Sequence, residues 1–384
     1  MLEQALSWKK NFINDDVFIL APHDAGAKAQ EVIENVRIWR FRYWWPVSHQ
    51  KLAYPAILPN IQKNPLLIAQ LPSFLLCEFL ATRRLIKDEK IDFIFAHWIM
   101  PQGVTAFLAG KLLGVPYGLK NYSSDLRVFR KIPVFGTLLA KKIIRSSRQL
   151  ICENSRLRQE ALAYFPATER PIYETKISAL TMGVFHGLDI QPASPDDHYR
   201  YDFAFIGRLS KKKGIDSLIN ALKALKTEGV NFQAVIAGSG EEEAALKRAC
   251  NIPEIQFIGH VSGDRKNDLF AQTKFFVFPS RESDGDVEGL PVALLEALFM
   301  GKIVVASKAT NIELLPEWPE LHDRIDLIED PSSVSELAEL LRNLLDLNNE
   351  AVQRRVGQTQ SITSRFSWNN RIQQYRNLLI GDAR

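Results

Sequence analysis

Short apolar runs alternate with amphipathic segments along most of the chain. In the second half, runs rich in Val, Ile and Phe are each followed by a segment whose apolar residues recur at helical spacing. The runs that predict strands are 202–206, 233–237, 255–258, 275–278 and 303–306. The segments that predict helices are 214–226, 241–249, 264–272 and 291–300. Repeated alternation of this kind is typical of a doubly wound parallel sheet, the Rossmann-like α/β architecture.

The first half has the same alternation but opens differently. Its predicted strands are 17–21, 91–96, 116–119 and 149–152, with a helix at 103–113. An amphipathic segment at 2–12 precedes the first of these strands. A doubly wound domain opens with a strand and a glycine-rich turn, so the pattern predicts a first domain without its opening strand. A late start or a truncation explains this better than a working shorter fold.

A polar segment with prolines and no periodicity, residues 191–201, separates the two halves. The chain of 384 residues also exceeds the roughly 250–300 residues at which a single core stops growing. We therefore expect an N-terminal domain at 1–190, a linker at 191–200 and a C-terminal domain at 201–366. Residues 367–384 predict a helix that packs back on the first domain.

The composition, with 46% hydrophobic and 24% charged residues, excludes a disordered or low-complexity chain. Cys77, Cys152 and Cys250 lie far apart without metal-ligand spacing, which indicates reduced thiols in a cytosolic protein. The most apolar stretch, residues 65–81, contains Gln70, Pro72 and Glu78 and is expected to be too short to span a bilayer. We expect a protein that is cytoplasmic, with at most peripheral contact with the membrane.

The net charge of +4 is unevenly distributed. Residues 1–190 contain 25 Lys and Arg against 16 Asp and Glu, whereas the rest of the chain contains 23 against 28. A basic first half favours an anionic partner: a phosphate-bearing acceptor, a membrane surface or nucleic acid.

Gly207 and Arg208 directly follow a predicted strand, and Lys213 stands at the start of the next predicted helix. Ligands of open α/β sheets bind beyond the carboxyl ends of the strands, where helix N-termini also point. Arg208 and Lys213 are therefore expected to bind a diphosphate. The alternative is a solvated basic loop.

Two carboxylates, Glu288 and Glu296, flank the start of the helix predicted at 291–300. Glu288 would lie in the loop, where the backbone of Gly289 and Leu290 lines a ligand pocket. Glu296 would be a charge on a largely apolar helix, which needs a partner such as two ribose hydroxyls. An arginine in the core is the alternative partner.

In this order, these segments resemble the retaining nucleotide-sugar glycosyltransferases of group 1, or glycosyltransferase family 4. Residues 278–298 are most similar to bacterial exopolysaccharide enzymes of the colanic acid or amylovoran kind. Residues 96–103 resemble the family's His-Trp-x-x-Pro-x-Gly segment. The resemblance implies a GT-B fold: two Rossmann-like domains facing across a cleft, with the donor in the second and the acceptor in the first. It implies that Glu288 contacts the donor sugar and Glu296 the ribose.

The chain departs from the family in its first domain. Where the family has His-Gly-x-Asp, this chain has Lys-Asn-Tyr-Ser-Ser-Asp at 120–125, with Tyr122 in place of the histidine and Asp125 retained. His97 is then the remaining candidate histidine of the pocket, and a core histidine is the alternative. The family's Gly-Gly segment is also replaced, by residues 307–313.

No metal or other cofactor is expected, because fixed cations and helix N-terminal amides can stabilise a departing nucleoside diphosphate. The Asp-Gly-Asp at 284–286 is interpreted as a loop turn rather than a metal site.

The segment Arg127–Arg148 is basic, amphipathic and free of acids. This pattern suits an anionic membrane surface, where a polyprenyl-diphosphate-linked acceptor would lie. A solvated helix face is the alternative. The aromatic residues at 39–45 alternate with period two, which favours a core strand over a nucleic-acid surface, so no nucleic-acid partner is expected.

The sequence therefore predicts a metal-independent, retaining hexosyltransferase that transfers a sugar from a UDP- or GDP-sugar to a glycan or lipid-linked acceptor in surface polysaccharide synthesis. The alternatives are an inactive GT-B chain kept as a scaffold and a nucleotide-sugar epimerase. The upstream genomic sequence is expected to decide between an active and an inactive chain.

Overall fold

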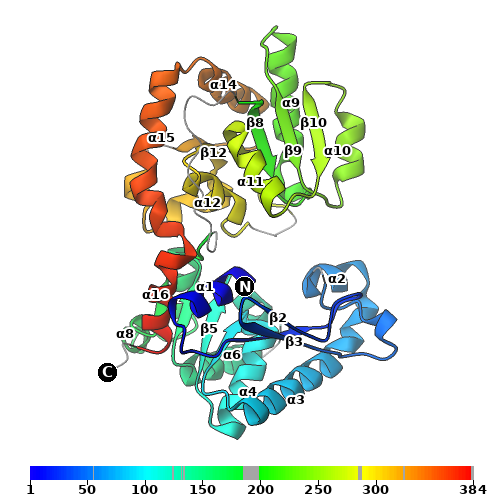
Figure 1. The fold of residues 1–384 in the computed structure, drawn as a ribbon, viewed down its shortest axis with the longest axis vertical. Coiled ribbons are helices and arrows are strands. Elements are labelled where there is room, and N and C mark those ends of the chain that lie inside the picture. The colour runs from blue at the N-terminus through cyan, green and yellow to red at the C-terminus, as the bar shows by residue number, and fades with distance from the viewer. Residues whose placement is uncertain are drawn as a thin grey trace. The chain divides into compact units, whose positions relative to one another are not determined.

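The computed structural model describes residues 1–54, 56–122, 125–130, 132, 135–184, 199–283, 288–322 and 325–381, with 357–363 described by their backbone only. The chain divides into two compact units (Figure 1). The first comprises Met1–Leu180 together with the chain from Ile372 onward, and the second comprises Thr181–Arg371. Most of the linker expected at 191–200 lies outside the described residues.

The first unit contains two sheets. In one, β1 (Phe18–Pro22) pairs parallel with β3 (Val36–Phe41), which pairs antiparallel with β2 (Gln30–Ile33). The other sheet is wholly parallel, in the order β4 (Ile94–His97), β5 (Tyr117–Asn121), β6 (Leu150–Cys152) and β7 (Ile177–Ala179). Helix α1 (Leu2–Asn11) comes before β1, as its pattern predicts, and no strand precedes β1 in the part of the chain described.

Helices connect and cover the strands of the first unit. They are α2 (Ile57–Lys63), η2 (Pro65–Gln70), α3 (Leu71–Glu89), η3 (Ile99–Gly103), α4 (Val104–Leu113), α5 (Asp125–Arg130), α6 (Phe135–Ser146), α7 (Ser155–Leu162) and α8 (Arg170–Glu174), with a short 3₁₀ turn η1 (Val47–His49). Figure 1 shows α3 and α4 side by side, and the Glu78 carboxylate on α3 accepts a hydrogen bond from Thr105 on α4 at 2.7 Å.

The last helix, α16 (Trp368–Leu379), contributes its second half to the first unit. The Tyr375 hydroxyl donates to the carbonyl of Leu180 at 3.3 Å, and the Tyr375 ring lies 6.1 Å from the ring of Phe95 on β4. Leu379 packs so close to Gly118 on β5 that a β-carbon there would lie 2.3 Å from it. The end of the chain thus covers part of the parallel sheet of this unit.

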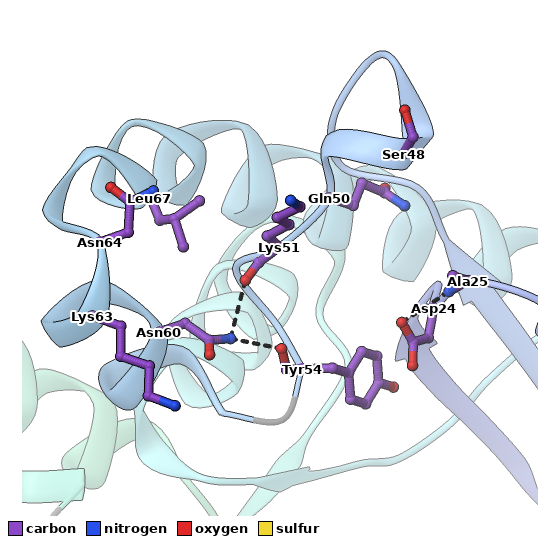
Figure 2. A pocket seen from close by; sticks show the side chains of 10 residues that line it. All are labelled: Asp24, Ala25, Ser48, Gln50, Lys51, Tyr54, Asn60, Lys63, Asn64 and Leu67. Atoms are coloured by element: carbon purple, nitrogen blue, oxygen red, sulfur yellow. Dashed lines mark hydrogen bonds between the residues drawn. The ribbon is translucent and has the colours of Figure 1, made fainter. Parts of the chain in front are cut away.

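A hollow of about 480 Å³ lies on the first unit, beside α2 and η2 (Figure 2). Asp24 and Ala25 line it from the loop after β1, and residues between Ser48 and Tyr54 line it from the loop after β3. None of the residues predicted to take part in the function lines this hollow.

The second unit is a single parallel sheet of six strands. Their order is β10 (Ile255–Gly259), β9 (Ala234–Ala237), β8 (Tyr201–Ile206), β11 (Thr273–Phe278), β12 (Ile303–Ser307) and β13 (Ile325–Ile328). Counted along the chain, this is the order 3-2-1-4-5-6 of a dinucleotide-binding Rossmann sheet.

Helices and 3₁₀ turns complete the second unit. They are η4 (Lys211–Lys213), α9 (Ile215–Thr227), α10 (Glu243–Ala249), α11 (Asp264–Ala271), α12 (Val292–Phe299), η5 (Lys308–Thr310), η6 (Ile312–Leu314), α13 (Trp318–Leu321), α14 (Val334–Leu345), α15 (Asn349–Thr363) and η8 (Ser364–Phe366).

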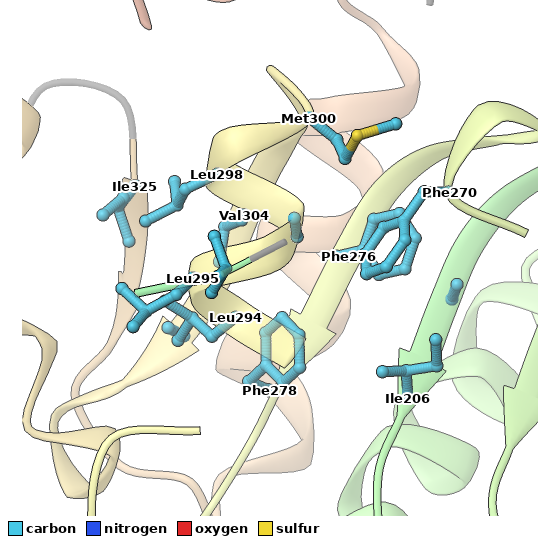
Figure 3. Packing of buried hydrophobic residues seen from close by; sticks show 14 of the residues in the cluster. Ile206, Phe270, Phe276, Phe278, Leu294, Leu295, Leu298, Met300, Val304 and Ile325 are labelled. Carbon is cyan, nitrogen blue, oxygen red and sulfur yellow. The ribbon is translucent and has the colours of Figure 1, made fainter. Parts of the chain in front are cut away.

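Alternate side chains of each strand enter two separate cores, one on either face of this sheet. On β11, Phe276 and Phe278 pack with Leu294 and Leu295 of α12 (Figure 3), whereas Phe275 packs in the core beneath α9 and α14. Strands covered by helices on both faces must be apolar on both faces, which is why they were visible in the sequence as continuous apolar runs.

Candidate active site

Loops at the carboxyl ends of β8, β9 and β11 approach one another so closely that three glycines, Gly214, Gly238 and Gly240, leave no room for a β-carbon. Gly214 at the start of α9 has a φ of +65°, and a β-carbon there would lie 1.9 Å from the carbonyl oxygen of Pro279. Gly238 after β9 has a φ of +145°, and its β-carbon would lie 1.8 Å from the carbonyl oxygen of Gly207. These contacts fix the backbone at the edge of the sheet where ligands of such folds bind.

Two of the predicted donor residues meet at this edge. Lys213, in η4 after β8, lies with its Nζ 2.6 Å from Oε2 of Glu288, in the loop before α12. Their side chains are only 14% and 11% exposed. The pair brings together the residue predicted to bind the diphosphate and the residue predicted to contact the donor sugar.

A third segment holds Glu288 in place. Asn311 follows β12, has a φ of +59° and donates from its side-chain amide to the carbonyl of Glu288 at 2.6 Å. The replacement of the family's glycines at 307–313 is visible in the sequence, but the contact of Asn311 with Glu288 was not predicted. Asparagine tolerates the left-handed conformation better than most residues other than glycine, which is the signal that could have found it.

Arg208 lies at the same edge but in a different environment. Its guanidinium contacts the carboxylate of Glu241 at 3.1 Å, and both side chains are 40% exposed. Exposed pairs of this kind contribute about 0–1 kcal/mol. The guanidinium can therefore exchange Glu241 for another anion at little cost.

Glu296 is buried, 3% exposed, in the second turn of α12. Its Oε1 lies 2.5 Å from Nζ of Lys266 on α11. The predicted alternative was an arginine partner; the structure places a lysine there. Sequence reasoning missed Lys266 because it lies 30 residues away, in another helix.

Leu290 and Gly289 take different positions in the same loop. The side chain of Leu290 is buried in the core beneath α12, whereas Gly289 is half-buried.

Pro291 is the N-cap of α12, so the helix begins one residue later than the predicted range 291–300. The Asp-Gly-Asp at 284–286 lies outside the described residues.

The predicted residues of the first unit also lie close together. His97 ends β4 and Tyr122 follows β5, and His97 Nδ1 lies 2.6 Å from the Tyr122 hydroxyl oxygen. Asp125, buried at the start of α5, accepts a hydrogen bond from the backbone N–H of Ile99 at 3.3 Å.

Burial determines the charge state of this group. It lowers the pKa of His97 to about 3, with smaller contributions from the N-terminal amine and Lys120. It also raises the pKa of the Tyr122 hydroxyl well above its usual value. Both side chains are therefore neutral at pH 7, so they can donate or accept hydrogen bonds but carry no charge.

A buried ion pair, missed in the sequence, lies behind them. Lys120 on β5 contacts Glu153 after β6 at 2.6 Å, and their side chains are 1% and 3% exposed. Lys120 also donates to the carbonyl of Leu180 at 2.7 Å. This pair ties the ends of β5, β6 and β7 together.

No group of three or more His, Cys, Asp or Glu side chains that could hold a metal occurs within the described ranges. Metal independence stays a prediction.

Comparison with known proteins gives a family match for the part of the chain that contains Lys213, Glu288 and Glu296. Residues 189–359 match the family Glycosyl transferases group 1. An uncharacterized glycosyltransferase of Methanocaldococcus jannaschii is 22% identical over 77% of each chain. An amylovoran biosynthesis glycosyltransferase of Erwinia amylovora is 35% identical, but over only 29% of each chain.

Among solved structures, the sucrose-phosphate synthase of Thermosynechococcus elongatus aligns with a TM-score of 0.68 at 15% identity, covering 97% of this chain and 90% of that one. The fold is that of the GT-B glycosyltransferases, with two Rossmann-like units. The predicted resemblance is confirmed: residues 189–359 form a group 1 glycosyltransferase domain, similar to those of exopolysaccharide enzymes.

Proposed function

We propose that the chain is a retaining hexosyltransferase that uses a UDP- or GDP-sugar to extend a glycan or a polyprenyl-diphosphate-linked acceptor in surface polysaccharide synthesis. The proposal includes action in the cytoplasm, with peripheral contact with the inner face of the membrane. The observation that supports it most directly is the Lys213–Glu288 pair at the carboxyl ends of parallel strands. A cation beside a carboxylate suits a ligand that has phosphates at one end and sugar hydroxyls at the other.

In the proposed reaction, the bond between the sugar's anomeric carbon and the β-phosphate oxygen breaks. The acceptor oxygen bonds to the same carbon with the donor's anomeric configuration kept, and the hydroxyl proton leaves with the nucleoside diphosphate. Lys213 and Arg208 stabilise the negative charge that builds on the leaving phosphate. Glu288 accepts hydrogen bonds from the sugar hydroxyls, and this is the contribution that aligns the anomeric carbon.

Glu296 binds the ribose in this proposal, through the carboxylate that Lys266 now contacts. Because His97 and Tyr122 are neutral at pH 7, their proposed role is to position the acceptor hydroxyl by hydrogen bonds rather than to carry a proton. Asp125 holds the backbone of Ile99 next to them.

Thermal unfolding with UDP, GDP, ADP and their sugar conjugates tests the donor assignment. A ligand present at 100 times its Kd stabilises the protein by about 2.7 kcal/mol. We expect one base to stabilise the wild type and to lose that effect in Glu288→Gln, which keeps the size of the side chain. No stabilisation by any nucleotide would favour the inactive, scaffold-like chain.

The reaction itself is tested with the stabilising donor and a lipid-diphosphate acceptor. NMR of the product's new glycosidic bond is expected to show the donor's anomeric configuration, and an inverted product would overturn the retaining assignment. Activity is expected to survive EDTA. Loss of activity on chelation, with recovery on adding Mg²⁺ or Mn²⁺, would overturn metal independence.

A further inference from the structure

The helical segment Pro65–Glu89, which comprises η2 and α3, has apolar residues on both of its faces. It is long and apolar enough to cross a membrane by length and composition, although the sequence analysis expected its apolar part to be too short. Only 17% of its most apolar window is buried. A helix that is apolar all round is normally buried or in contact with lipid.

The inner face of this segment belongs to the domain core, so the segment does not span a bilayer in this fold. Phe74 is fully buried against Phe41, the last residue of β3, and Tyr43, which follows that strand, and Leu67 and Leu71 pack against the same cluster. The buried Glu78 carboxylate is hydrogen-bonded to Thr105. The inner face therefore accounts for only part of the apolar residues.

The outer face presents large apolar side chains to solvent. Leu66 is 82% exposed, Ile68 58% and Leu76 58%. The loop after β3 adds Trp45, which is 84% exposed. That loop is bound to η2, because the Gln70 side-chain amide donates to the carbonyl of His49 at 2.8 Å.

The same part of the chain is basic. No Asp or Glu occurs from residue 35 to residue 77. Arg37 and Arg40 are paired with Glu89 and Glu31, from outside this range. Arg42, Lys51 and Lys63 have no acidic partner in the described part of the molecule.

Lys51 and Lys63 line the hollow beside α2 (Figure 2). Among the described residues that line it, Asp24 is the single acidic one. An anionic headgroup would therefore meet two lysines there, next to the exposed apolar residues of η2.

We propose that these residues form a membrane-docking surface, made of Trp45, Leu66, Ile68 and Leu76 with the cations Arg42, Lys51 and Lys63, and that its occupant is an anionic lipid bilayer. The apolar side chains enter the interface between headgroups and acyl chains, and the lysines contact lipid phosphates. Exposed tryptophan is typical of that interface. This inference rests on the membrane contact in the proposed function and deepens it by naming the surface that makes the contact. It does not depend on sugar transfer.

Charge favours lipid over the other possible occupants. A second copy of the chain would bring two basic surfaces together, which like-charge repulsion opposes. Nucleic acid would need stacking aromatics, but Trp44 packs against the inner cluster and leaves Trp45 as the exposed tryptophan of this loop.

Vesicle co-sedimentation with the full chain tests the proposal. One set of vesicles contains equal parts of phosphatidylcholine and phosphatidylglycerol, and the other contains phosphatidylcholine alone. We expect binding to the anionic vesicles and a loss of about tenfold in Leu66→Ser/Ile68→Ser and in Lys51→Gln/Lys63→Gln. Because the four side chains lie at the surface, each variant should unfold at the same temperature as the wild type.

Two matched variants locate the contact. Ile172→Ser changes an apolar residue that is 70% exposed on α8 and should bind as the wild type does. Phe135→Ser/Leu138→Ser changes the two most exposed of the large apolar residues described in the segment Arg127–Arg148. Loss of binding in this variant alone would overturn the docking surface proposed here in favour of that segment.

Three other results would overturn the proposal. The first is that the wild type does not bind anionic vesicles. The second is that the protein forms a dimer without lipid and that Leu66→Ser/Ile68→Ser dissociates it. The third is that the wild type binds RNA as well as it binds vesicles and that Lys51→Gln/Lys63→Gln loses both. Donor binding is measured on the same preparations by thermal unfolding. Failure to bind vesicles is thus separated from failure of the proposed glycosyltransferase function.

Discussion

The two units use charge in opposite ways at the carboxyl ends of their strands. In the second unit, Lys213 and Glu288 are partly exposed, and Arg208 makes only a surface contact. In the first unit, the His97–Tyr122 pair is neutral and the charges of Lys120 and Glu153 are buried behind it. A charge that must meet a ligand has to stay accessible, whereas a charge that ties strands together is most effective when water is excluded.

The largest effect should come from removing one half of the buried pair in the first unit. Lys120→Met leaves Glu153 as an uncompensated buried charge, which should lower the free energy of unfolding by about 3–5 kcal/mol. Urea unfolding measures it. The double variant Lys120→Met/Glu153→Leu should recover most of the loss, and a double variant no more stable than the single one would show that the charges themselves are not the cause.

The corresponding change in the second unit should act on ligand binding instead. Lys213→Met removes the proposed charge-assisted contact with the donor diphosphate, which should weaken nucleotide binding by about 1.5–3 kcal/mol. Unfolding stability should change much less than in Lys120→Met. Titration calorimetry measures the affinity, with the exposed neighbour Lys211→Met as the control. Equal losses in both variants would mean that overall charge, rather than this position, matters.

The pH dependence of stability sharpens the same comparison, because the first unit buries groups that titrate near neutrality. Burial raises the pKa of Glu78 to about 7, above its unfolded value of 4.5. The folded protein then holds a proton that the unfolded chain has lost, so stability falls as pH rises from 4.5 to 7. Glu78→Gln should be more stable than the wild type at pH 8 by about 3 kcal/mol and similar to it at pH 4.

His97 changes stability in the opposite direction. Its folded pKa of about 3 lies below the unfolded value of 6.5, so its contribution is present above pH 6.5 and is lost as the pH falls towards 3. His97→Gln should flatten this acid limb of the stability curve. If the loss of stability between pH 6.5 and pH 3 is as steep in this variant as in the wild type, burial of the neutral His97 imidazole does not cause it.

The smallest effect should come from the exposed pair of the second unit. Glu241→Gln removes the partner of Arg208 and should change unfolding stability by less than about 0.5 kcal/mol. Nucleotide affinity should rise slightly, because the guanidinium of Arg208 no longer has to leave Glu241 before it binds a phosphate. A large loss of stability would show that the Arg208–Glu241 pair stabilises the fold, as the Lys120–Glu153 pair of the first unit does.

Much of the fold could be predicted from the sequence because buried parallel strands are continuous apolar runs. The strands β8, β9 and β10 lie within one or two residues of the predicted ranges. The hairpin of β2 and β3 was missed in part because its turn is Glu34-Asn35, both with positive φ and neither a glycine. β13 was missed because Asp326 interrupts its short apolar run, at the edge of its sheet.

The site could be predicted only where its residues follow a strand directly or begin a helix. Gly207 and Arg208 directly follow β8, and Lys213 and Glu288 lie in the segments just before α9 and α12, which is why their residue types were informative. The partners Lys266, Asn311 and Glu153 could not be found, since a contact across the sheet between distant segments leaves no spacing in the sequence. The neutrality of His97 and Tyr122 also depends on burial, which the sequence does not specify.

The ion pair between Lys213 and Glu288 has a consequence for selectivity among small anions. Lys213 already has an anionic partner, so inorganic phosphate would gain little by displacing the glutamate and would leave that carboxylate without a partner. A molecule that presents phosphate oxygens to the lysine and hydroxyl groups to the glutamate satisfies both at once. If the site binds its donor as proposed, the pair would select an intact sugar nucleotide over simpler phosphates.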